Sequence, residues 1–135
     1  TPMQWSSELN GGFTIGEPWM NTNKNCSEIN VNDQQNDHSS ILNYFRMMAE
    51  FRKTNEVLTY GSYQPIVETP DSLFLYFREN AKEKLLIVLN FSDQVVNLPD
   101  HVWAKISEQL AGNYTESGSP DKARAWEAII YRCLI

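Results

Sequence analysis

The sequence is poor in residues on which several classes of function depend. It has only 2 cysteines and 2 histidines among 135 residues, without a Cys-x-x-Cys pair. Zinc-site spacing is therefore absent, and we expect neither a metal nor another cofactor. Its 6 glycines include no glycine-rich run that leads into the Gly-Lys-Ser/Thr of a phosphate loop. A Gly-x-Ser-x-Gly elbow is also missing, which removes the local signature of a serine hydrolase.

Long apolar runs are missing as well. No stretch approaches the roughly 18 consecutive apolar residues of a membrane helix, and no basic start with an apolar run marks a secretion signal. We expect no membrane segment in this chain. The scattered pair Cys26 and Cys133 favours free thiols and a cytoplasmic protein, with secretion or membrane attachment of the intact protein as the alternatives. Because Thr1 opens the chain without a Met, inside what reads as a loop, we expect an upstream start.

The sequence has fewer basic than acidic residues. The chain has 17 Asp and Glu against 11 Lys and Arg, a formal net charge of -6, which argues against a nucleic-acid partner. Hydrophobic residues make up 41% and aromatic residues 12%. That composition is enough for a core and rules out disorder throughout.

The first part of the chain has features of a piece of a larger domain. Residues 1–36 show neither helical nor strand period, yet contain Trp5 and Trp19, so we expect this segment to pack on structure outside it. Asp37 is predicted to cap a helix that ends near Asn55. Its apolar residues recur at three to four positions; they are Ile41, Phe45, Met48 and Phe51.

From residue 57 onward the apolar period changes to two, which is typical of strands. The predicted strands are 57–60, 72–78, 84–91, 94–98, 105–110 and 127–133, each bounded by turn residues. They predict a mainly β architecture, an antiparallel β-sandwich with Greek-key returns. We place a domain boundary near Glu56, between residues 1–55 and residues 56–135.

A series of motifs runs through nearly the whole chain in order. They are Thr1-Pro2-Met3-Gln4-Trp5, Asn10-Gly11-Gly12-Phe13-Thr14, Pro18-Trp19, Glu28-Ile29-Asn30-Val31, Phe51-Arg52-Lys53, Val57 to Tyr63, Leu89-Asn90-Phe91-Ser92, Gly112-Asn113-Tyr114 and Ala125-Trp126-Glu127-Ala128. The series resembles the α-glucosidase group of glycoside hydrolase family 13, and the first motif resembles its oligo-1,6-glucosidase and maltase-like subgroup. Ser6, Gly11 and Cys26 depart from the pattern of many relatives, which leaves the substrate open among maltose, isomaltose, sucrose and trehalose phosphate.

The resemblance implies which parts of the fold this chain contains and where the catalytic residues lie. Residues 1–55 would be the last loop and last helix of a (β/α)8 catalytic barrel, and residues 56–135 the β-sandwich that follows it. The family's retaining hydrolysis of α-glucosidic oligosaccharides uses an Asp nucleophile, a Glu acid/base and a second Asp, all upstream of Thr1. This chain would therefore have no catalytic residue of its own and would pack on the missing barrel. Gln4 and Trp5 would be its substrate-proximal residues, or would only brace the loop under the pocket.

Two other functions stay open. One is the glucosidase-like ectodomain of an amino-acid transporter heavy chain, which is not an enzyme. The other is a free-standing sugar-binding sandwich that uses Trp103 and Trp126 as stacking platforms, although we expect these two side chains to be buried in the core.

Overall fold

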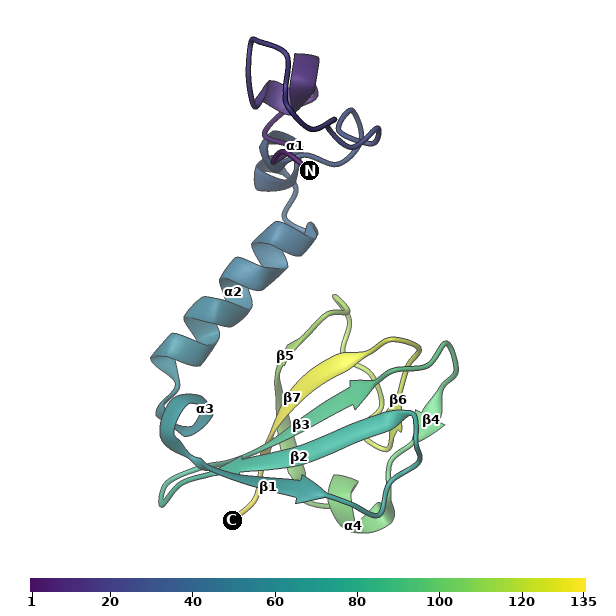
Figure 1. Cartoon of the computed structure of the whole chain (residues 1–135). Coiled ribbons are helices and arrows are strands. Elements are labelled where there is room, and N and C mark those ends of the chain that lie inside the picture. The colour runs from purple at the N-terminus through teal and green to yellow at the C-terminus, as the bar shows by residue number, and fades with distance from the viewer. The chain divides into compact units, whose positions relative to one another are not determined.

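A computed structural model describes residues 1–135 and divides them into two compact units, Thr1–Phe51 and Arg52–Ile135 (Figure 1). Each unit is described by itself. The domain assignment made from the sequence, 1–55 and 56–135, stays a prediction. None of the helices is both long and apolar enough to cross a membrane.

The first unit consists of loops and short helices. It contains a 3-10 helix, η1 (Leu9–Gly12), the helix α1 (Val31–Asn36) and most of the helix α2 (Ile41–Thr54). The expectation that residues 1–36 are irregular throughout is therefore wrong for η1 and α1. Helix α1 begins where it does because the Asn30 side chain accepts a hydrogen bond from the backbone N of Asp33 at 3.0 Å.

The predicted cap of the long helix is also wrong. Asp37 follows the end of α1, and its carboxylate accepts hydrogen bonds from the backbone N and the hydroxyl of Ser39. These bonds lower the pKa of Asp37. Ser40 takes the capping role instead, because its hydroxyl oxygen accepts from the backbone N of Asn43 at 3.2 Å. Helix α2 consequently begins at Ile41 rather than at residue 38.

The first unit has no hydrophobic core. Its buried residues are Pro2, Gly11, Asn30 and Ser40, and none of its large hydrophobic side chains is buried. Eleven of those side chains are exposed: Met3, Trp5, Leu9, Phe13, Ile15, Trp19, Met20, Ile29, Ile41, Phe45 and Met47. Polar bonds such as those from the Asn43 side-chain N to the carbonyls of Gln34 and Asp37 hold the unit together.

The second unit begins with a short helix where the sequence predicted a strand. Residues Glu56–Tyr60 form α3, so the predicted strand 57–60 is wrong. The turn closes because the backbone N of Gly61 donates to the carbonyl of Val57 at 3.0 Å. The Arg78 side chain then donates to the carbonyls of Val57 and Leu58, which fixes α3 at one end of the sheet.

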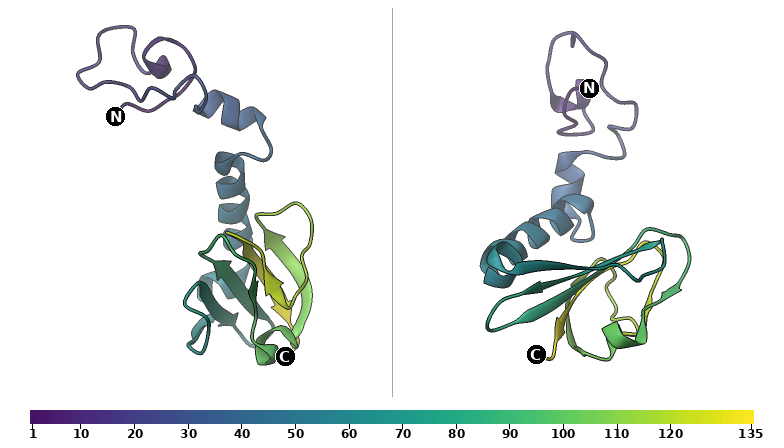
Figure 2. Two further views of the ribbon diagram at one scale, coloured as in Figure 1. Left: turned by 90° about the vertical axis from the view of Figure 1, so that its right-hand side faces the viewer. Right: turned by 60° about the horizontal axis from the view of Figure 1, so that its bottom comes forward.

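An antiparallel sheet of five strands forms the body of this unit (Figure 1). Its strand order is β1-β2-β3-β7-β5, with bounds β1 (Ser62–Ile66), β2 (Leu73–Glu79), β3 (Lys84–Asn90), β7 (Ala128–Cys133) and β5 (Ile106–Gly112). The last strand lies between β3 and β5, as in a sandwich with Greek-key returns. A second layer contains the pair β4 (Val96–Asn97) and β6 (Lys122–Ala123) and the helix α4 (Asp100–Trp103), seen in green below the sheet in the right-hand view of Figure 2.

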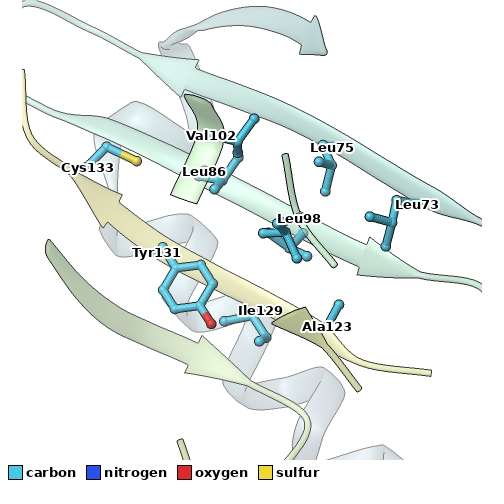
Figure 3. Close-up of a cluster of buried hydrophobic side chains, with 10 residues drawn as sticks. Leu73, Leu75, Leu86, Leu98, Val102, Ala123, Ile129, Tyr131 and Cys133 are labelled. Atoms are coloured by element: carbon cyan, nitrogen blue, oxygen red, sulfur yellow. The ribbon is translucent and has the colours of Figure 1, made fainter. Parts of the chain in front are cut away.

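The hydrophobic core lies between the sheet and the second layer (Figure 3). Alternate residues of β2, β3 and β7 face it, and the second layer closes it. The core residues are Leu73, Leu75, Leu86, Val88, Leu98, Val102, Ala123, Ile129, Tyr131 and Cys133. Trp103 packs against this cluster and is partly buried, whereas the expected burial of Trp126 is wrong, since its side chain is 60% exposed.

The predicted mainly β sandwich, preceded by a loop and a helix, is confirmed. Five predicted strands match β2, β3, β4, β5 and β7 within a few residues. The sequence analysis did not identify β1, β6 or α4.

Candidate functional site

The predicted site residue Gln4 is a structural anchor of the N-terminal loop. Its side-chain N donates to the Oδ1 of Asn25 at 3.1 Å and to the carbonyl of Ile29 at 2.7 Å. Its own carbonyl accepts from the backbone N of Val31 at 2.9 Å. Both amide hydrogens of Gln4 therefore have partners inside the loop, which leaves only its side-chain oxygen available to a ligand.

Trp5 differs from Gln4 in that its backbone, and not its side chain, is held by hydrogen bonds within the loop. The backbone N of Trp5 donates to the carbonyl of Gly11 at 2.8 Å, and its carbonyl accepts from the backbone N of Asn32 at 3.0 Å. The side chain is 51% exposed. The loop thus holds a tryptophan ring at its surface with a fixed backbone, while the proximity of Gln4 and Trp5 to a substrate stays a prediction.

A left-handed turn supports the segment around Trp5. Asn10, Gly11 and Gly12 have φ values of 55°, 66° and 68°, a run that is accessible because two of the three are glycine. The Asn10 side-chain N donates to the carbonyls of Thr14 and Gly16, at 3.2 and 2.9 Å. A larger residue at Gly12 would be strained by the φ of 68°, and its Cβ would in addition lie 2.5 Å from the hydroxyl oxygen of Ser6, which would have to rotate away.

Asn25 and Asn30 are residues of the loop that sequence reasoning did not single out as a pair. Asn25 accepts from Gln4, and the Asn30 side-chain N donates to the carbonyl of Cys26 at 3.0 Å and to Asp33 at 2.7 Å. The spacing of Asn30 and Asp33 is a helix-cap signal that could have located the start of α1. The hydrogen bond between the side chains of Gln4 and Asn25 joins residues 21 positions apart, and no local sequence pattern predicts it.

A hollow of about 480 Å³ lies in the same loop. Its lining residues are Glu8, Leu9, Gly12, Phe13, Thr14 and Ile15, and Gln4 and Trp5 are not among them. Glu8 is its single carboxylate, so the hollow lacks the pair of carboxyl groups that glycoside hydrolysis requires. No group of three or more His, Cys, Asp or Glu side chains is arranged to hold a metal ion.

The second unit contains a dense polar cluster next to β7. Glu127 is buried, and its carboxylate accepts from the backbone N of Arg124 at 2.5 Å and from the Nε at 2.7 Å, with a further bond from the guanidinium. The hydrogen bonds to Glu127 raise the pKa of Arg124. The guanidinium also lies 4.0 Å from the ring centroid of Tyr114. These groups satisfy one another, which indicates a structural cluster rather than a reactive one.

Comparison with known proteins gives the chain a family context. Residues 1–61 match the family model "Alpha amylase, catalytic domain". The chain is 36% identical over 138 residues to the oligo-1,6-glucosidase of Parageobacillus thermoglucosidasius, an alignment that covers 98% of this chain and 25% of that protein. It is 32% identical over 139 residues to the trehalose-6-phosphate hydrolase of Bacillus subtilis, again over 98% of this chain and 25% of the relative.

The structure resembles solved structures over nearly the same extent. The isomaltulose synthase of Klebsiella sp. LX3 superposes with a TM-score of 0.88 at 32% identity, covering 98% of this chain and 24% of that one. The trehalose-6-phosphate hydrolase of Bacillus licheniformis gives a TM-score of 0.86 at 35% identity, over 98% of this chain and 25% of that one. The chain spans about a quarter of the length of each of these relatives.

Proposed function

This chain belongs to glycoside hydrolase family 13 and matches the C-terminal part of its members, and on that premise we propose that it is the C-terminal quarter of an α-glucosidase. The observation that carries the proposal is the alignment of 98% of the chain with an oligo-1,6-glucosidase at 36% identity. The intact protein hydrolyses terminal α-glucosidic bonds of maltose-type or isomaltose-type oligosaccharides with retention of configuration.

The chain itself has a structural role in this proposal. Retaining hydrolysis needs two carboxyl groups about 5 Å apart, one as nucleophile and one as acid and base, and in this family both come from the barrel upstream of Thr1. The first unit would complete that barrel with a loop and with α2. Its lack of any buried large hydrophobic side chain supports this role, because such a segment depends on neighbouring structure for its core.

The substrate is a matter for experiment, because these 135 residues resemble enzymes of different specificity. Its relatives include oligo-1,6-glucosidases, trehalose-6-phosphate hydrolases and isomaltulose synthases. The upstream coding region should first be sequenced for the family's Asp, Glu and Asp. The full-length protein should then be incubated with maltose, isomaltose, sucrose and trehalose 6-phosphate.

We expect glucose release by the full-length protein and none by residues 1–135 alone. A full-length variant with the nucleophilic Asp replaced by Asn is the matched inactive control. Conversion of sucrose into an isomer without net hydrolysis would replace the hydrolase proposal with an isomerase. An upstream region with a membrane helix and without the three acids would favour the transporter-subunit alternative, and glucose release by residues 1–135 alone would contradict the structural role.

We also propose that the intact protein works in the cytoplasm. Cys26 and Cys133 are free thiols, a state that a reducing compartment maintains. Fractionation of the source cells, followed by detection of the protein in the soluble, membrane and exported fractions, tests this location. Recovery mainly in the exported fraction would contradict it.

A further inference from the structure

The N-terminal loop, drawn in purple in Figure 1, contains the single Asn-Gly pair of the sequence, Asn10-Gly11. Every other asparagine is followed by a residue with a Cβ. A glycine leaves its backbone N open to approach by the preceding side chain, because no Cβ stands in the way. This pair is therefore the place in the chain where an asparagine side chain and the next backbone N react most readily with each other.

The reaction is deamidation, the loss of ammonia from the Asn10 side chain. The Gly11 backbone N forms a bond with the Cγ of Asn10, the bond from Cγ to Nδ2 breaks, and the proton of the Gly11 N–H leaves with the ammonia. Water then opens the resulting succinimide ring at either carbonyl and restores the N–H of Gly11. The product is aspartate or isoaspartate, and in isoaspartate the main chain runs through the former side chain. Water is the only co-reactant.

The closed loop opposes this reaction at both reacting groups. Gly11 is buried, and its backbone N donates to the carbonyl of Glu8 at 2.9 Å. That bond must break, because the succinimide ring leaves Gly11 without an N–H. The Asn10 side-chain N donates to the carbonyls of Thr14 and Gly16, and both bonds are lost when Nδ2 leaves. Ring closure therefore requires a local opening of the loop.

Such an opening costs little free energy, because polar bonds rather than a core hold the first unit together. None of its large hydrophobic side chains is buried, and segments with few buried apolar contacts open locally at low free energy. Among the bonds that keep the loop closed are those from the Gln4 side-chain N to Asn25 and to the carbonyl of Ile29. The structure thus places the reactive pair in a segment that is restrained and yet able to open.

Deamidation would remove bonds that the loop needs in order to close again. An ionised carboxylate accepts hydrogen bonds but donates none, so residue 10 would lose both carbonyl partners and would place a negative charge next to their oxygens. The Gly11 carbonyl accepts from the backbone N of Trp5 at 2.8 Å and from that of Ser6 at 3.0 Å. Isoaspartate adds one main-chain atom before Gly11, which would displace this carbonyl and loosen the backbone of Trp5.

We propose that Asn10 is a deamidation site of the folded protein, that local opening of the N-terminal loop sets the rate of the reaction, and that the conversion releases the backbone of Trp5. The reacting groups and the bonds that restrain them belong to this loop. The proposal is therefore independent of the proposed glucosidase function, and neither depends on the outcome for the other.

Mass spectrometry of peptides that contain residue 10 tests the site and its restraint. The full-length protein is incubated in native buffer and in urea at the same pH, and the gain of one mass unit is followed with time. We expect Asn10 to convert before any other asparagine, and more slowly in native buffer than in urea by a factor of at least about ten, an opening free energy of about 1.4 kcal/mol or more. Equal rates would overturn the restraint. A native protein that keeps Asn10 intact while the unfolded one converts fully would overturn the site.

The variant Gln4→Ala tests whether loop opening sets the rate. It removes the side-chain bonds to Asn25 and to the carbonyl of Ile29, so the native rate at Asn10 should rise by a factor of about three or more, while the rate in urea stays the same. Gln64→Ala, at an exposed position of β1 in the second unit, is the matched control and should change neither rate. Equal native rates in the two variants would overturn the link between opening and deamidation.

Hydrogen exchange of the Trp5 backbone N–H tests the consequence for the loop. Exchange is compared between the unmodified protein and the variant Asn10→Asp, which has the side chain of the aspartate product. We expect exchange at Trp5 to become faster by a factor of at least about five. The backbone N–H of Leu98, which donates to the carbonyl of Asp121 at 2.8 Å in the second unit, is the internal control and should exchange equally in both. Unchanged exchange at Trp5 would overturn the release of its backbone.

Discussion

At the scale of single residues, Asn90 connects the end of β3 to both neighbouring loops. Its side chain is buried, and its side-chain N donates to the carbonyls of Gln94 and Arg124 at 2.7 Å each. Its Oδ1 accepts from the backbone N and the hydroxyl of Ser92, at 3.0 and 2.8 Å. The Asn90 side chain therefore supplies a hydrogen-bond partner to four polar groups of the neighbouring loops.

We expect Asn90→Ala to lower the free energy of unfolding by about 3 kcal/mol, because several buried polar groups lose their partners at once. Urea unfolding followed by circular dichroism measures the change. Asn97→Ala, at an exposed position of β4, is the matched control and should change the free energy by less than about 0.5 kcal/mol. Equal effects of the two substitutions would contradict the role given to Asn90.

Tyr131 makes stability depend on alkaline pH. Burial raises the pKa of Tyr131 from 10.0 to about 12, with a further contribution from the charge of Glu127. The folded state therefore retains the phenolic proton where the unfolded state loses it. The contribution of Tyr131 to the free energy of unfolding is therefore fully present below pH 10. It is lost, by about 2–3 kcal/mol, as the pH rises to about 12.

The variant Tyr131→Phe tests this pH dependence. The hydroxyl has no hydrogen-bond partner in the chain, so the substitution should change the free energy of unfolding at pH 7 by less than about 1 kcal/mol. The difference between the two proteins should grow in favour of the variant between pH 10 and pH 12. Parallel pH profiles would show that Tyr131 ionises normally in the folded state.

The candidate site shows what single residues reveal before a structure is known. The motif that begins at Thr1 identifies Gln4 and Trp5 as residues of interest through the resemblance of the chain to a family. The bond from Gln4 to the carbonyl of Ile29 crosses 25 residues of chain. Such a contact depends on loop geometry, for which the sequence has no periodic signal.

At the scale of elements, a regular spacing of apolar residues predicted the long strands correctly, whereas the shortest elements had no spacing from which they could be predicted. The alternation along β2 and the continuous apolar run of β3 predicted both strands within two residues. The pair β4 and β6 has 2 residues in each strand, too few for a period to emerge. The run Val57-Leu58-Thr59-Tyr60 has strand-like composition but forms α3, because the bonds from Gly61 and Arg78 outweigh local propensity.

The junction between α3 and β1 depends on Gly61. A Cβ at this position would lie 2.4 Å from the carbonyl oxygen of Val57 and 2.9 Å from that of Glu79, and both are backbone atoms that cannot rotate away. We expect Gly61→Ala to destabilise the second unit by about 1–3 kcal/mol, since the helix or the strand must shift. The midpoint of urea unfolding measures the loss.

Gly16→Ala is the control for this substitution. Its Cβ would have only the Thr14 hydroxyl oxygen as a neighbour, at 3.8 Å. We expect a change below about 0.5 kcal/mol. If Gly61→Ala were as mild as this control, the close approach of the two carbonyls to Gly61 would not be a constraint on the fold.

At the scale of the whole molecule, the exposed apolar side chains predict association of residues 1–135 in isolation. Ile41 and Phe45 lie four residues apart on α2, so they share one side of the helix, and they are 83% and 68% exposed. Light scattering should show a mass that rises with concentration. A monomer at high concentration would contradict this expectation.

Charge placed on that side of α2 should reduce the association. The double variant Ile41→Lys with Phe45→Lys should lower the apparent mass at a given concentration. The matched control is Val67→Lys with Val95→Lys, which adds the same charge at exposed positions outside α2. Equal effects of the two double variants would attribute the change to net charge rather than to the helix.

The central position of β7 has a consequence for synthesis on the ribosome. Strand β3 pairs with β7 along one edge, yet β7 begins at Ala128, 38 residues after β3 ends at Asn90. At a translation rate of about 5–20 residues per second, that edge of β3 waits about 2–8 seconds for its partner. During this interval the nascent chain presents an unpaired apolar edge in a crowded cell. Among the edges that become paired within the sheet, that edge of β3 therefore stays unpaired for the longest time during synthesis.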